Sequence, residues 1–173
     1  MNTQTNEIRI YVADLAAYNN GYLHGVWIDA TAELTDIQDQ VRAMLAASPE
    51  NGAEEYAIHD YEGFGDYKLS EYEGLEAAHN IASFIEEFPD FGSALLNHCG
   101  DIEEARAFAE DNYCGCYLSL ADYAQELTEE TTEIPAHLAF YIDYDAMARD
   151  MEMSGDVFTV EIGYQQVHVF WGK

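Results

Sequence analysis

Carboxylates are the side chains of this sequence best able to do chemistry, because 34 of its 173 residues are Asp or Glu and only 6 are Lys or Arg. Two carboxylates at a suitable separation can act as the acid and the base of a glycoside hydrolase, or can support metal-dependent hydrolysis. At this density such pairs arise by chance, so they do not identify a hydrolase. A metal-dependent hydrolase using paired carboxylates stays an alternative, but we expect no enzymatic activity, no catalytic residue and no cofactor.

The best calcium-binding pattern is the run Asp60 to Glu71, which has the length of an EF-hand loop. Asp60, Glu62, Gly65 and Glu71 match loop positions one, three, six and twelve. Phe64 and Lys68 stand where oxygen ligands are needed. We therefore do not expect a calcium site.

Histidine and cysteine do not show the spacing of metal ligands. The six histidines are His24, His59, His79, His98, His137 and His168. Cys99, Cys114 and Cys116 could join His98 around zinc, but Cys-x-Cys is not the usual Cys-x2-Cys knuckle and no second knuckle follows. We expect no metal site, reduced thiols that are buried or half-buried, and structural roles for His59 and His168 in strands.

The stretch from residue 50 to residue 90 concentrates the negative charge. Its twelve acids are Glu50, Glu54, Glu55, Asp60, Glu62, Asp66, Glu71, Glu73, Glu76, Glu86, Glu87 and Asp90, against the single cation Lys68. The same stretch holds seven Tyr and Phe side chains, which are typical of a packed core and not of a solvated acidic tail. The acids should therefore lie on a folded body.

The net charge of −28 restricts the partners. Nucleic acid and anionic membranes would be repelled, whereas a basic protein would be attracted. Duplex DNA carries one charge per ~1.7 Å, so 28 charges on an elongated body correspond to roughly 48 Å of duplex. This density fits a DNA mimic, although an acidic protein of halophile type would also be rich in acids. With no signal-like or membrane-spanning segment, we expect a cytoplasmic protein.

The pattern along the chain predicts an α+β fold in three domains. In residues 1–62, alternation predicts strands at 8–14, 23–28 and 55–59, and helical spacing predicts one helix from Thr35 to about Ser48. Residues 63–112 form a predicted helical domain, with helix starts marked by capping boxes at Ser70 and Asp101 and one helix ended by Pro89.

Residues 113–173 form the predicted third domain. A helix over 119–130 carries a stripe of acids at Asp122, Glu126, Glu129 and Glu133, which costs roughly 0.2–0.5 kcal/mol per like-charge pair. Nothing local offsets that cost, which favours a use for the charge outside the fold. Two further helical pieces lead to Gly155, and alternation predicts a terminal hairpin over 157–171.

Segments spread over the whole chain resemble the ArdA-type antirestriction proteins. They are Ile10–Ala13, Leu15–Gly21, Leu23–Ala30, Glu54–Phe64, Ser119–Ala124, Tyr141–Tyr144, Met151–Asp156 and Val167–Trp171. The resemblance implies a non-enzymatic inhibitor of type I restriction-modification enzymes, carried by conjugative plasmids or transposons. It also implies an elongated three-domain DNA mimic that forms a homodimer through its C-terminal domain and occupies the DNA-binding channel of the methyltransferase core.

The family's antirestriction motif would fall near Ser119–Glu133. Tyr18 and His24, in the first motif, could suggest catalysis, but we expect them to shape a loop or to pack. We expect a distributed set of acids, called the acidic surface below, to bind the partner. It consists of Glu54, Glu55, Asp60, Glu62, Asp66, Glu71, Glu73, Glu76, Glu86, Glu87, Asp90, Asp101, Glu103, Asp122, Glu126, Glu129, Glu130, Glu133, Asp143, Asp145 and Asp150.

Overall fold

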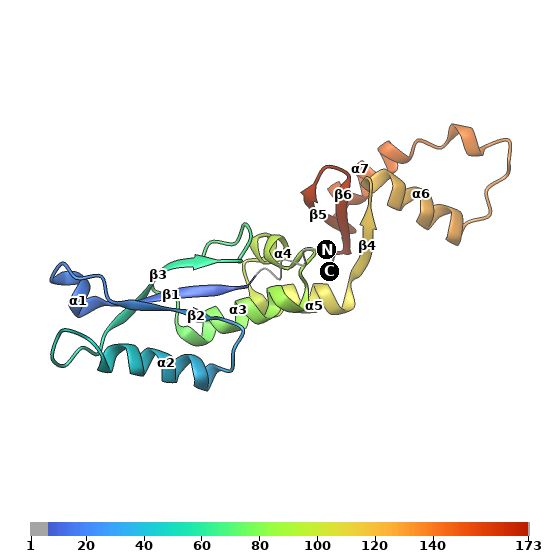
Figure 1. Ribbon diagram of the computed structural model, residues 1–173. Helices are drawn as coiled ribbons and strands as arrows, with labels where there is room; N and C mark the ends of the chain where they lie inside the picture. Colours follow the sequence, from blue (N-terminus) through green and yellow to red (C-terminus); the bar gives the residue numbers. More distant parts are fainter. Residues whose placement is uncertain (1–6, 173) are drawn as a thin grey trace, which may run out of the picture. The chain divides into compact units, whose positions relative to one another are not determined.

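The computed structural model describes residues 7–172 and shows an α+β protein, as the sequence predicts (Figure 1). Within these residues the chain forms seven α-helices, one 3-10 helix and two antiparallel sheets of three strands each. Contacts divide the chain into two compact units, Met1–Ser93 and Ala94–Lys173. The three domains predicted from the sequence are a finer division and stay a prediction. No helix in the described part of the chain is long and apolar enough to cross a membrane.

The first unit is built on a sheet with the strand order β2-β1-β3. Its strands are β1 (Arg9–Asp14), β2 (Gly25–Asp29) and β3 (Tyr56–Glu62), and both neighbours run antiparallel to β1. All three predicted strands are therefore confirmed. Between β1 and β2 the structure adds a short helix, α1 (Leu15–Asn19), where only a turn was expected.

The two faces of this sheet differ. Ile10, Val12 and Ile28 are fully or almost fully buried on one face. Helix α2 (Leu34–Ala46), which confirms the predicted helix, packs against β1 and β2 and buries Ile37 in the same core (Figure 1). Since side chains alternate along a strand, the other face carries the intervening residues, polar and aromatic, that begin with Arg9 and Tyr11. One face of the sheet therefore forms the apolar core, and the opposite face remains available for other contacts.

Asp14 fixes the turn from β1 into α1. It is the N-cap of α1, is completely buried, and accepts a hydrogen bond from the Ala17 N–H at 3.3 Å. Burial alone would raise the pKa of Asp14, but the Ser48 hydroxyl, the backbone N–H groups of Ala17 and Ala16, and the charge of His24 together lower it. The ionised form of Asp14 therefore stabilises this corner of the unit.

The Asp14→Ala variant should lose about 1 kcal/mol of stability at pH 7, since the cap of α1 and its buried acceptor are removed. Because the folded-state pKa of Asp14 is lowered, its contribution is complete above the ordinary value of about 3.9 and is lost as the pH falls through the folded value. Urea unfolding at pH 7 and at about pH 3 should show a gap between wild type and variant that shrinks in acid. Asp14→Asn keeps the acceptor and should cost less; an equal cost would contradict the capping role.

The first unit ends in helices. Helix α3 (Leu75–Glu87) stops before Pro89, as predicted, and the division between the units falls within α4 (Gly92–Cys99). The predicted helix start at Ser70 is wrong. Its Oγ accepts the Tyr72 N–H at 3.3 Å and holds only a turn, while α3 begins five residues later. A capping-box spacing can therefore mark a turn as well as a helix.

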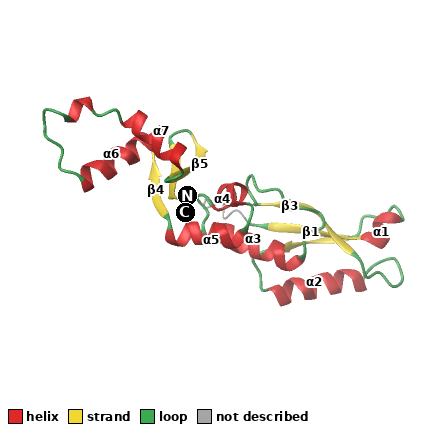
Figure 2. Cartoon of the chain, turned by 180° about the vertical axis from the view of Figure 1, so that it is seen from behind, coloured by secondary structure: helices red, strands yellow, loops and turns green. Residues whose placement is uncertain are grey.

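The second unit has a sheet of order β4-β6-β5 and three more α-helices. Its elements are α5 (Ile102–Asp111), β4 (Tyr113–Tyr117), α6 (Leu120–Thr131), the 3-10 helix η1 (Ala139–Tyr141), α7 (Tyr144–Ser154), β5 (Val157–Gly163) and β6 (Gln166–Trp171). Asp101 caps α5 and Gly155 ends α7 at φ 82°, as predicted, and the terminal hairpin is confirmed. Strand β4 was not predicted. A long loop joins α6 to η1 (Figure 2).

Candidate partner-binding surface

The acidic surface lies on the outside of both units. Of its 21 carboxylate residues, 20 are exposed and Glu73 is half-buried. They come from β3 and the loop before it, from α3 and the loops around it, and from α5, α6, α7 and residues that flank these three helices. None of them is part of the apolar core of its unit, so the acidic surface faces solvent.

Internal cations neutralise little of this charge. With 34 acids and 6 cations, at least 28 carboxylates have no one-to-one counter-charge within the chain. Arg42 pairs with Asp39 at 2.8 Å and Arg106 pairs with Glu110 at 3.3 Å, and both of these acids lie outside the acidic surface. The field of the acidic surface is therefore almost uncompensated, which attracts and orients basic partners.

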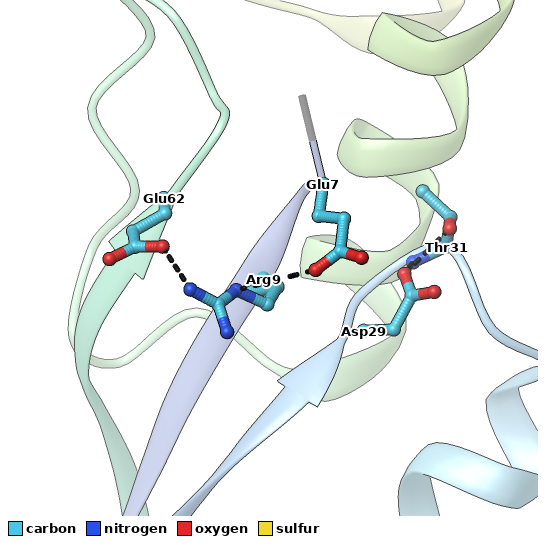
Figure 3. Close-up of polar contacts among 5 residues, drawn as sticks. All are labelled: Glu7, Arg9, Asp29, Thr31 and Glu62. Atoms are coloured by element: carbon cyan, nitrogen blue, oxygen red, sulfur yellow. Dashed lines mark hydrogen bonds and ion pairs between the residues drawn. The ribbon is translucent and has the colours of Figure 1, made fainter. Parts of the chain in front are cut away.

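Glu62 of the acidic surface pairs with a cation of its own chain. The Arg9 guanidinium contacts Glu62 at 2.5 Å and lies 4.0 Å from Glu7 (Figure 3). It also lies over the Trp27 ring, 5.1 Å from the ring centroid. The hydrogen bond and charge of Glu62 raise the pKa of Arg9 further. Nearby, Asp29 accepts hydrogen bonds from the Thr31 N–H and hydroxyl at the end of β2. This corner shows how the outer face of the sheet holds a guanidinium between an aromatic ring and a carboxylate.

Helix α6 presents part of the predicted stripe. Asp122, Glu126 and Glu129 are exposed along it, while Tyr123 on the other side is buried in the core with Val157, Val167 and Val169. Burial, then the hydrogen bond and charge of Glu126, raise the pKa of the Tyr117 phenol to about 12. Glu126 therefore adds to the effect of burial on Tyr117 beside this helix.

The stripe is shorter than predicted at its C-terminal end. The helix stops at Thr131, because Thr132 takes an extended backbone with φ −136° and ψ 129°. Two consecutive β-branched residues favour this exit, and the Thr131 hydroxyl donates to the Leu127 carbonyl at 2.7 Å. Glu133 is therefore exposed in the following loop, and the prediction that it continues the helical stripe is wrong.

In the described part of the chain, the cysteines and histidines do not form a metal-binding cluster. Among residues 7–172 no three His, Cys, Asp or Glu side chains are placed to hold a metal. Cys99 and Cys114 are half-buried, as expected, but Cys116 is exposed on the outer strand β4, where side chains are covered from fewer sides. His168 is buried and its Nδ1 lies 2.7 Å from the Tyr113 hydroxyl, which confirms a structural role.

Sequence reasoning missed a cavity of about 240 Å³ on the first unit. Its lining residues are Tyr11, Ala13, Tyr18, Tyr22, Leu23, His24, His59 and Asp60. The Nε2 of His24 donates to the Met44 carbonyl at 2.7 Å, which fits the packing role expected for it. Tyr18 stands edge-on to the His59 ring with centroids 4.8 Å apart. The signal that could have found this group was the density of aromatic residues in the first motif.

The family comparison names the class of protein. Residues 10–166 match the family model described as antirestriction protein (ArdA), so this fold with its acidic surface is that of an antirestriction protein. More specifically, the chain belongs to the ArdA antirestriction protein family, which confirms the resemblance found in the sequence. A comparison with curated proteins found no match.

Proposed function

We propose that this protein is a DNA mimic that inhibits type I restriction-modification enzymes by occupying the DNA-binding channel of their methyltransferase core. Family membership supports an antirestriction function. The observation that carries the mimicry is the acidic surface, whose carboxylates are nearly all exposed, occur on both units and belong to a chain with 34 acids against 6 cations. A channel built to bind phosphates offers Lys and Arg side chains at close spacing, and such groups bind carboxylates equally well.

The proposal requires no catalysis. The protein would act in the cytoplasm by competition, and its affinity would come from many modest charge contacts. Electrostatic attraction between an acidic ligand and a basic channel also raises the association rate. Both alternatives, a halophile-type acidic protein and a metal-dependent hydrolase using paired carboxylates, leave the family match without an explanation.

The proposal is tested by displacement of DNA. Purified protein added at low salt to a type I methyltransferase carrying a fluorescent duplex should release that duplex, and fluorescence anisotropy should fall as the protein concentration rises. Poly-L-glutamate at equal carboxylate concentration is the matched control. We expect it to compete far less, because its charges are not fixed on a folded body.

Failure to displace the duplex would refute the mimic. Circular dichroism at the same low salt shows that the protein in the assay is folded. It also separates the halophile alternative, since a protein that depends on high salt for its fold would lose it there.

We also propose that the protein is a homodimer that associates through its second unit. The loop containing η1 exposes three large apolar side chains, with Leu138 46%, Phe140 96% and Tyr141 83% accessible. A neighbouring hollow of about 560 Å³ is lined by residues that include Ile134 and Tyr144. Apolar side chains gathered on an otherwise acidic body are typical of a surface that becomes covered.

The Phe140→Asp variant should shift the protein from dimer to monomer, because a charge would replace an apolar contact and meet the same charge on the second copy. Sedimentation velocity at micromolar concentration would measure the shift. Tyr72→Asp is the matched control, since Tyr72 is 84% exposed in the first unit. A Phe140→Asp protein that sediments like wild type would exclude this loop from the interface.

A further inference from the structure

The cavity on the first unit combines aromatic rings with one carboxylate. Tyr11, Tyr18 and His59 supply ring surfaces, and Asp60 stands at the same cavity. Asp60 is exposed, and one of its oxygens accepts the Tyr61 N–H at 2.8 Å, which fixes the carboxylate. Within residues 7–172 no Lys or Arg forms an ion pair with Asp60. The cavity therefore offers a negative charge and π-faces to a cation that the chain itself does not provide.

The backbone sets the positions of the side chains that line this cavity. In the sheet, Tyr11 is paired with Asp60 on one side and with Trp27 on the other. Gly25 makes room for the Tyr11 ring, since a Cβ at that position would lie 2.7 Å from the ring carbon Cζ. Tyr18 reaches the cavity from α1, whose start is held by the buried Asp14. The ring positions are thus set by strand pairing and by close backbone packing.

The same face already binds one guanidinium in this manner. Arg9 is two residues before Tyr11 on β1, so both side chains project from the same side of the sheet. Arg9 pairs with Glu62 (Figure 3) and lies over the Trp27 ring. The next cross-strand pair, Tyr11 with Asp60, repeats the combination of ring and carboxylate but holds no internal cation.

The size of the cavity restricts the ligand. About 240 Å³ is below the roughly 300–1,000 Å³ of sites for drug-sized molecules, so it suits one side chain better than a metabolite. A planar guanidinium can stack on an aromatic ring and bind a carboxylate at the same time, which an ammonium cannot do as well. On a protein of net charge −28 the approaching partner must be basic.

We infer that this cavity binds the guanidinium of an arginine side chain presented by the basic partner protein, with Asp60 as the anion and Tyr11 and Tyr18 as the stacking rings. The inference deepens the proposed function and names an anchoring point within the acidic surface. A side chain that inserts between rings adds a geometric requirement to the distributed charge, so it would contribute to which basic proteins are accepted.

N-acetylarginine methylamide, titrated into the full-length protein at low salt, tests the inference by aromatic NMR chemical shifts. We expect saturable shifts of the Tyr11 and Tyr18 ring signals. N-acetylcitrulline methylamide, which has nearly the same shape but no charge, should produce none that saturate. Asp60→Asn should weaken binding by about two- to fivefold, as should Tyr18→Leu, since each removes one exposed ion-pair or cation–π contact.

Asp39→Asn is the matched control, because Asp39 is an exposed acid of α2 that lies outside the acidic surface and does not line the cavity. It should bind the arginine compound like wild type. The inference would be overturned if the wild-type protein bound the citrulline compound or a lysine analogue as well as it binds the arginine compound. It would also be overturned if the Asp60→Asn and wild-type proteins bound the arginine compound equally. The test contains no restriction enzyme, so loss of arginine binding with DNA displacement intact refutes this inference alone, and the reverse result refutes only the proposed function.

Discussion

Raising the salt concentration from about 50 to about 200 mM should weaken binding of this protein to a type I methyltransferase by roughly a hundredfold or more, as it does for proteins that bind the phosphates of DNA. The reason is that a channel lined by Lys and Arg interacts with the exposed carboxylates as it does with phosphates. Screening then reduces every one of these contacts at once. Anisotropy or surface plasmon resonance over a salt series gives the slope of log affinity against log salt.

The association rate measured over the same salt series is as informative as the affinity. Most of the loss in the association rate should occur over the first additions of salt, since long-range attraction is screened first. The same methyltransferase with a duplex of its recognition sequence is the control and should show a slope of the same sign. A flat salt dependence for the protein would mean that an apolar contact, and not the acidic surface, carries the affinity.

Neutralising six acids of the acidic surface together should reduce inhibition by roughly a hundredfold, whereas each single change should cost no more than about fivefold. The six changes convert Glu76, Glu86, Asp90, Asp122, Glu129 and Glu130 to the matching amides, and all six side chains are exposed. Distributed charge contacts are individually weak and add when they are far apart. Inhibition of methylation in a titration series would measure each variant.

The control for charge alone is the pair Asp39→Asn with Glu110→Gln. These acids are paired with Arg42 and Arg106 and lie outside the acidic surface. Their double variant should inhibit almost like wild type, although it carries two fewer negative charges. A single amide change that abolished inhibition would point instead to one focal site. The changes at Glu129 and Glu130 remove negative charge near the C-terminal end of α6, where it is unfavourable, and Asp122→Asn keeps an oxygen acceptor for the Ser119 hydroxyl at the start of the helix. Unfolding of α6 would therefore not explain a loss of inhibition.

Hydrophobic pattern was sufficient to predict most elements of this fold. The alternation around Ile10 and Val12 gave β1, and the helical spacing of Ile37 and Val41 gave α2, because one face of each is buried. Strand β4 was not predicted, because its sequence, Tyr113 to Tyr117, contains two cysteines and a glycine and shows no alternation of apolar and polar residues. It is a strand because β6 pairs with it along the sheet, which is a tertiary effect that no local pattern carries.

The candidate site was only partly predictable for a related reason. The exposure of the acidic surface follows from the cost of burying a carboxylate, so composition was enough to anticipate it. The cavity beside Asp60 depends on which residue of β3 lies opposite Tyr11, and the pairing of β1 with β3 shifts register between Tyr11 and Val12. An irregularity of one residue changes which side chains share a face, and it cannot be found without the partner strand.

Each small sheet of this protein has two outer strands, β2 and β3 in one and β4 and β5 in the other. Outer strands can add strands from other molecules, which is a common route to aggregation. Here mutual repulsion between copies opposes such encounters, so the charge that suits a partner also provides colloidal stability. That protection should vanish near the isoelectric point of about 4.1, where the molecules become free to associate edge to edge.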